Sequence, residues 1–180
     1  FRNTEGRAAH GSTPEAGVNA IDSLFRNLTE SSLFEKFPGD LKSFTEFYMK
    51  YIESDTTGAR LHADHSDDRL GDATMNSGVL EGDRDHIEIR VDYRYPANID
   101  CEQYLRNIED ICGREGLEFR LIKHKQGLYF PEDHELVKTL TEVYAEETGE
   151  VSEPVSMGGG TYAKSLPNTV AFGPIFPGHE

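Results

Sequence analysis

His10 is the first residue of this chain whose position suggests chemistry. It lies in the segment AAHGSTP at residues 8–14, between a stretch that can form a strand and one that can begin a helix. A histidine at such a junction is exposed and held by a rigid turn, so its ring could donate a hydrogen bond to a developing oxyanion. On the residues alone, a surface histidine in a helix-capping turn, without a catalytic role, is the more common outcome for such a segment.

A second candidate site is a glycine-rich loop, formed by Gly158, Gly159, Gly160 and Thr161. Backbone N–H groups of such a loop, placed before a helix, can bind a carboxylate or a phosphate. The loop is not a nucleotide-binding P-loop, because no Lys-Ser or Lys-Thr pair follows at the required spacing. A flexible connector would have the same composition, so the glycines alone leave both readings open.

Arg94 ends the run IEIRVDYR at residues 87–94, in which apolar and charged side chains alternate. This alternation is typical of a half-buried strand and puts Arg94 on the polar face, together with Arg90. A guanidinium group near a strand end could bind a carboxylate through two parallel hydrogen bonds. A solvated or salt-bridged arginine would leave the same pattern.

One polar loop gathers several side chains of the types that bind metals: His62, Asp64, His65, Asp67 and Asp68. Their spacing matches no zinc template, and no predicted helix or strand fixes the side chains. We therefore predict a solvated acidic loop and assign no metal ligand in this chain.

Composition limits the possible partners. With 33 acidic and 18 basic residues the formal net charge is −15, which opposes binding to nucleic acids. No apolar run approaches the length of a membrane span, so no membrane partner is expected. Cys101 and Cys112 lie on one predicted helix, roughly 16 Å apart and too far for a disulfide. Two unpaired thiols fit the reducing cytoplasm.

The order of predicted elements in residues 1–126 indicates an α+β fold. Ser12 or Thr13 is the expected N-cap of the first helix, with Pro14 at its first position. The elements predicted from the patterns are a strand at 3–10, helices at 14–28 and 41–52, a β-hairpin of 73–81 with 86–95, a helix at 100–111 and a strand at 117–123. This order is close to a ferredoxin-like antiparallel sheet with helices on one face.

Residues 127–180 are too few for an independent domain. An amphipathic helix at 135–148 and a short apolar strand at 170–172 are expected there, separated by the glycine loop. We predict an incomplete α/β segment that belongs to a larger partner. The chain also starts without Met, so we expect it to be a piece of a longer protein.

Three segments of the chain together resemble one family. GRAAHGSTPEAGVNAIDSL, IEIRVDYRYP and MGGGTYAKSLPNTVAFGPIFPG are similar to segments of zinc-dependent dipeptidases of the peptidase V kind, within the aminoacylase/carboxypeptidase-type metallopeptidases. They occur in the family's order and span nearly the whole chain. The first and third would be parts of the lid and of the return to the catalytic domain, which implies a lid at 1–126 and a catalytic-domain portion at 127–180.

The resemblance implies a cytoplasmic enzyme that hydrolyses dipeptides with two zinc ions. A lid histidine that stabilises the oxyanion corresponds to His10, and a lid arginine that holds the substrate carboxylate corresponds to Arg94. The loop at Gly158, Gly159, Gly160 and Thr161 would add substrate contacts. Lys164 stands where many relatives have arginine, so it keeps the charge but loses the planar fork.

The family's zinc ligands and general-base glutamate have no counterparts here, so the chain alone is expected to be inactive. His179 lies near the place of the last zinc ligand but not at the motif position, and it is not assigned. An alternative hypothesis is a stand-alone ferredoxin-like module for binding or dimerisation. A lid separated from its partner would leave apolar surface uncovered around the helices at 15–28 and 101–112, which predicts a homodimer.

Overall fold

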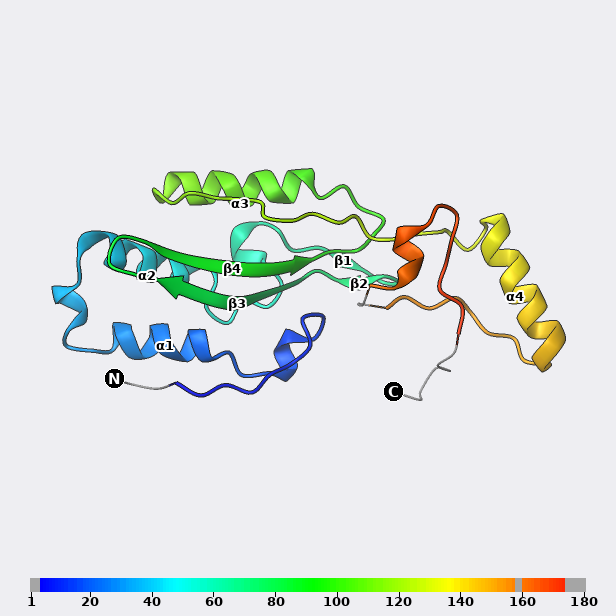
Figure 1. Cartoon of the computed structure of the whole chain (residues 1–180), viewed down its shortest axis with the longest axis horizontal. Helices are drawn as coiled ribbons and strands as arrows, with labels where there is room; N and C mark the ends of the chain where they lie inside the picture. Colours follow the sequence, from blue (N-terminus) through cyan, green and yellow to red (C-terminus); the bar gives the residue numbers. More distant parts are fainter. Residues whose placement is uncertain (1–3, 158–159, 174–180) are drawn as a thin grey trace.

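The computed structural model describes residues 4–157 and 160–173, and over these residues the fold is α+β (Figure 1). The described residues contain four α-helices and two small antiparallel sheets of two strands each. The helices are α1 (Ala20–Thr29), α2 (Gly39–Tyr51), α3 (Glu102–Arg114) and α4 (Glu135–Thr148). The strands are β1 (Ser66–Asp67), β2 (Gly71–Asp72), β3 (Thr74–Gly82) and β4 (Ile87–Arg94). Four 3₁₀ helices are η1 (Pro14–Ala16), η2 (Phe34–Lys36), η3 (Ala59–Leu61) and η4 (Tyr162–Ser165).

The β3–β4 hairpin is the central element, and its prediction from the turn at residues 82–85 and the alternating side chains of residues 87–94 is confirmed. The strands pair in an antiparallel register from Thr74 opposite Arg94 to Gly82 opposite Ile87. Asp83 fixes the turn, because its Oδ1 accepts hydrogen bonds from the N–H groups of Asp85 and His86 at 2.9 and 3.0 Å. A bulge lies in β3 between Ser77 and Val79.

Helices α1, α2 and α3 pack with the hairpin around one hydrophobic core. Figure 1 shows α1 along one side of the hairpin, α3 along the other and α2 passing behind it. Phe25 of α1 and Tyr48 of α2 stack with ring centroids 4.2 Å apart and lie at the centre of the core. Met75 of β3 and Ile111 of α3 are also buried in this core. Burial of each such side chain stabilises the fold by about 1.5 to 3 kcal/mol.

The N-terminal strand and the start of the first helix differ from the prediction. Instead of a strand at 3–10, the described residues form one isolated bridge, Arg7 with Val18. The segment from Pro14 begins as η1 and then turns extended at Gly17, where a Cβ would lie 2.8 Å from the carbonyl oxygen of Arg7. The bridge between Arg7 and Val18 needs extended backbone, so α1 starts only at Ala20. Asn19 is the N-cap of α1, in place of Ser12 or Thr13.

The strand expected at 117–123 is not part of either sheet. Gly116 has a φ of +77° and reverses the chain after α3, so the segment runs back along that helix (Figure 1). Leu117 and Phe119 pack on the core, and Arg120 pairs with Glu88 of β4 at 3.0 Å. Side chains hold the segment, so the ferredoxin-like sheet is reduced to the hairpin in the described residues.

The C-terminal segment contains the predicted helix. α4 spans Glu135–Thr148 as expected, with His134 as its N-cap and Gly149 at a φ of +73° after its end. Residues 170–172, expected as a strand, have no regular structure. Arg69, in the turn after β1, forms an ion pair with Glu132 just before α4. The division of the chain at residue 126 stays a prediction.

Cys101 and Cys112 are both free, as their spacing predicted, and both are buried. Across residues 4–157 and 160–173, none of the helices has the length and apolar character needed to cross a membrane.

Candidate functional site

His10 lies on the surface in a tight turn that fixes its ring. The N–H of Thr13 donates to the carbonyl oxygen of His10 at 2.9 Å, which closes the turn. Nδ1 of the ring lies 2.7 Å from Oγ of Ser12 and accepts from the backbone N–H of Ser12 at 3.3 Å. A backbone N–H can only donate, so Nδ1 is the acceptor and the proton of the neutral ring lies on Nε2. Nε2–H is therefore the ring's donor group.

Arg94 is held at the end of β4 by an aspartate from the same strand. Its Nε and Nη2 lie 3.0 and 2.9 Å from a single carboxylate oxygen, Oδ2 of Asp92. The two side chains are 35% and 51% exposed, so the pair lies at the surface within reach of a small molecule. The prediction that Arg94 lies on the polar face of the strand is confirmed.

The turn of His10 lies directly against this pair. Oγ1 of Thr74, opposite Arg94 in the register of the hairpin, donates to the carbonyl oxygen of Gly11 at 3.1 Å. A Cβ built on Gly11 would lie 2.7 Å from Nη2 of Arg94 and 2.8 Å from Oδ2 of Asp92. Two candidate residues that the sequence places far apart, His10 and Arg94, thus come together at one end of the hairpin.

The glycine-rich loop is only partly described. Gly158 and Gly159 lie outside the described residues, and Gly160 and Thr161 lead into η4. Lys164 is exposed on η4, and its Nζ lies 3.9 Å from a Cβ built on Gly160. The substrate contacts assigned to this loop and to Lys164 stay predictions.

The loop of histidines and aspartates is a structural turn. Oδ1 of Asp67 accepts from the N–H groups of Leu70 and Arg69, and Oδ2 accepts from Asn98 at 2.8 Å. The N–H of Leu70, then Asn98, lower the pKa of Asp67. His65 contacts the hydroxyl of Tyr104 at 3.0 Å. Among the residues that the structure describes, no three His, Cys, Asp or Glu side chains converge to hold a metal ion.

A buried polar network was missed by the sequence patterns. The hydroxyl of Tyr48 donates to Oδ1 of Asp22 at 2.5 Å and lies 2.8 Å from Oγ of Ser77. Asn19 donates to the carbonyl oxygen of Ser77 at 2.9 Å. Burial, followed by the hydrogen bond to Asp22, raises the pKa of Tyr48. An aspartate in the first turn of a helix usually lies at the surface, where it stabilises the helix dipole. The presence of an aspartate at position 22 therefore did not indicate that its side chain is buried.

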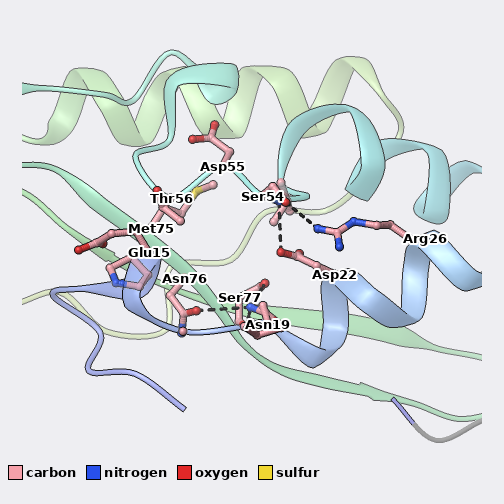
Figure 2. Close-up of a pocket in the computed structure, with 14 residues that line it drawn as sticks. Glu15, Asn19, Asp22, Arg26, Ser54, Asp55, Thr56, Met75, Asn76 and Ser77 are labelled. Carbon is pink, nitrogen blue, oxygen red and sulfur yellow. Dashed lines mark hydrogen bonds between the residues drawn. The ribbon is translucent and has the colours of Figure 1, made fainter. Parts of the chain in front are cut away.

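The network borders a pocket of about 260 Å³ between α1, the turn after α2 and β3. Figure 2 shows Asp22 and Arg26 of α1 facing Ser54, and Asn19 facing Asn76 and Ser77 of β3. The N–H of Ser54 donates to Oδ2 of Asp22 at 3.2 Å, and Nη2 of Arg26 donates to Oγ of Ser54 at 2.7 Å. These hydrogen bonds tie α1 to the chain after α2.

Comparison with known proteins gives staphylococcal relatives that carry the name of a dipeptidase. No protein-family model matches the chain. The chain is 32% identical over 177 residues to a Staphylococcus epidermidis protein named "Putative dipeptidase", and the aligned part covers 98% of the chain and 37% of that protein. A Staphylococcus aureus (strain MRSA252) protein with the same descriptive name is 30% identical over the same shares of both chains. The chain thus spans little more than a third of the length of these relatives.

Proposed function

We propose that this chain is part of a peptidase that hydrolyses dipeptides or short peptides, of the peptidase V kind. The strongest support is that the turn of His10 lies directly against Arg94. These are the two lid residues to which the family resemblance assigns contacts with the substrate. The similarity to the two staphylococcal proteins, over 98% of the chain, agrees with it.

In the proposed reaction His10 and Arg94 contact different parts of the substrate. Nε2–H of His10 donates to the oxygen of the scissile carbonyl, where negative charge develops as a nucleophile adds. The guanidinium of Arg94 binds the terminal carboxylate, and the glycine loop with Lys164 adds contacts. His10 then acts mainly on the transition state, whereas Arg94 binds the ground state and the transition state alike.

The proposed cofactor is a pair of zinc ions, and the described residues do not fit it. A catalytic zinc site needs at least three protein donors, and no such group of three occurs in the described part of the chain. The ligands would then belong to other residues of the complete gene product, where zinc would supply an activated water molecule. A cytoplasmic location is part of the same proposal, and the two free thiols agree with it.

Substitution of His10 tests the proposed role directly. In the complete gene product we expect His10→Ala to lower kcat for a dipeptide by about 10²- to 10³-fold, the usual effect of losing one oxyanion donor. KM and the zinc content should hardly change. His86→Ala is the matched control, because His86 is also exposed but lies in the hairpin turn. Near-normal kcat, or loss of metal together with activity, would contradict the role.

Arg94→Ala should act mainly through KM. Loss of one charge-assisted contact predicts a rise in KM, or a fall in kcat/KM, of roughly 10- to 150-fold. Arg90→Ala is the control on the same strand, where Arg90 pairs with Glu81 and Glu88 instead. A ferredoxin-like binding module without catalysis, the competing hypothesis, predicts no dipeptide hydrolysis by the complete gene product at all.

A further inference from the structure

We propose that Asp92 is a positioning residue that holds the guanidinium of Arg94 against the His10 turn, and that Gly11 is required because it leaves room for the pair. The effect of Asp92 on catalysis rests on the proposed function. The arrangement itself can be tested without a substrate.

The geometry of the ion pair restricts the guanidinium group. One oxygen atom, Oδ2 of Asp92, accepts from both Nε and Nη2 of Arg94 at 3.0 and 2.9 Å. Two hydrogen bonds from one rigid, planar group set its direction as well as its position. A guanidinium group whose direction is already set loses less conformational freedom when it binds a carboxylate.

The ion pair has little reason to exist for stability. Asp92 is 51% exposed and Arg94 is 35% exposed, and exposed pairs of this kind stabilise folded proteins only slightly. Both residues lie on one strand, so their contact also brings no distant parts of the chain together. The main effect of the ion pair is therefore to orient the guanidinium group of Arg94.

Gly11 places the turn of His10 at contact distance from the pair. A Cβ at Gly11 would lie 2.7 Å from Nη2 of Arg94 and 2.8 Å from Oδ2 of Asp92, closer than atoms can pack. These two atoms are the ends of flexible side chains, so Gly11→Ala should displace the guanidinium without breaking the fold. The backbone of Gly11 is outside the left-handed region, and alanine adds no strain there.

The first test follows the Arg94 Nε–H resonance in nitrogen-15 NMR spectra of this chain, assigned by its loss in Arg94→Lys. We expect Asp92→Ala and Gly11→Ala to shift this signal and to speed its hydrogen exchange by roughly tenfold or more, as expected for a lost hydrogen bond. Glu81→Ala is the control, because it removes a carboxylate from Arg90 and not from Arg94. An unchanged Arg94 signal in both variants overturns the inference, provided that their backbone spectra remain those of the folded chain.

The second test measures kinetics in the complete gene product. Asp92→Ala should raise KM by about tenfold with little change in kcat and in Tm, and Asp92→Glu should recover part of the loss. If Arg94→Ala impairs the enzyme and Asp92→Ala does not, the positioning role is wrong while the proposed function stands. If no variant or wild-type protein hydrolyses dipeptides, the proposed function fails, and the NMR result alone decides whether Asp92 orients Arg94.

Discussion

Tyr48 links the hydrophobic core to the polar network of α1 and β3. Its side chain is fully buried and stacks on Phe25, while its hydroxyl donates to Asp22. Removing that hydroxyl leaves the buried carboxylate without one of its donors, and an unsatisfied buried acceptor costs about 1 to 3 kcal/mol. We therefore expect Tyr48→Phe to lower the free energy of unfolding by this amount in urea titrations.

Tyr51→Phe is the matched control for this prediction. Tyr51 lies on the same helix, but its hydroxyl donates to Glu115 at the protein surface at 2.7 Å. The control should change the free energy of unfolding by less than about 0.5 kcal/mol, as most surface substitutions do. Equal effects of the two substitutions would show that the buried network does not stabilise the fold.

Tyr48 also predicts how stability changes at alkaline pH. Burial, and then the hydrogen bond to Asp22, raise its pKa above the usual value near 10. The folded chain thus keeps the proton more tightly than the unfolded chain does. The resulting stability is complete below about pH 10 and is lost as the pH rises from there through the folded pKa. Urea titrations between pH 8 and pH 11 should show a steeper loss in the wild type than in Tyr48→Phe, and parallel curves would contradict the prediction.

Asn19 connects two elements with a single side chain. Its Oδ1 caps α1 by accepting from the N–H of Ile21 at 2.9 Å, and its Nδ2 donates to the carbonyl oxygen of Ser77 in β3. Loss of an N-cap costs about 1 kcal/mol, and loss of the second contact adds a similar amount. Asn19→Ala should therefore destabilise the fold by about 2 kcal/mol in chemical denaturation.

Asn19→Ser separates the two roles of Asn19. Serine is a good N-cap but is too short to replace the amide that reaches β3. We expect it to restore about half of the stability lost in Asn19→Ala. If the serine and alanine variants are equally unstable, the contact between α1 and β3 dominates and the cap contributes little.

Elements were predictable where their pattern is local. Alternating side chains indicated β4, the turn at residues 82–85 indicated its hairpin partner β3, and an amphipathic pattern indicated α4 with its end at Thr148. The strands expected at 3–10 and 117–123 failed because strand formation depends on partners distant in sequence. For the same reason the sequence offered His10 and Arg94 as separate candidates. Their proximity depends on Gly11, the neighbour of His10, docking against β3 and β4, which no local pattern contains.

Apolar side chains at the surface are concentrated in the C-terminal part of the molecule. The helices at 15–28 and 101–112 are predicted to carry uncovered apolar surface, but Phe25 of α1 and Ile111 of α3 are buried in the core. The residues that are exposed instead include Val143, Val151, Val155, Met157, Tyr162, Leu166 and Phe172. Tyr162 and Val151 are 94% and 93% exposed, so almost none of their apolar surface is covered in this chain.

This distribution locates the predicted self-association of the chain. Burial of the C-terminal apolar side chains would favour a dimer, whereas the net charge of −15 opposes the approach of two copies. Salt screens that repulsion and leaves apolar contacts intact, so the dimer should become more stable between 0.05 and 0.5 M NaCl, conditions under which the Debye length falls from roughly 14 to 4 Å. Light scattering over a concentration series at both salt concentrations measures the effect.

Point substitutions then identify the surface that associates. Val155→Asp with Met157→Asp should weaken the dimer by at least about tenfold, because each buries a charge in an apolar contact. Leu33→Asp is the control, since Leu33 is also 56% exposed but lies between α1 and α2. A strict monomer at high protein concentration and high salt would contradict self-association. A dimer weakened only by Leu33→Asp would instead place the contact on the N-terminal part of the chain.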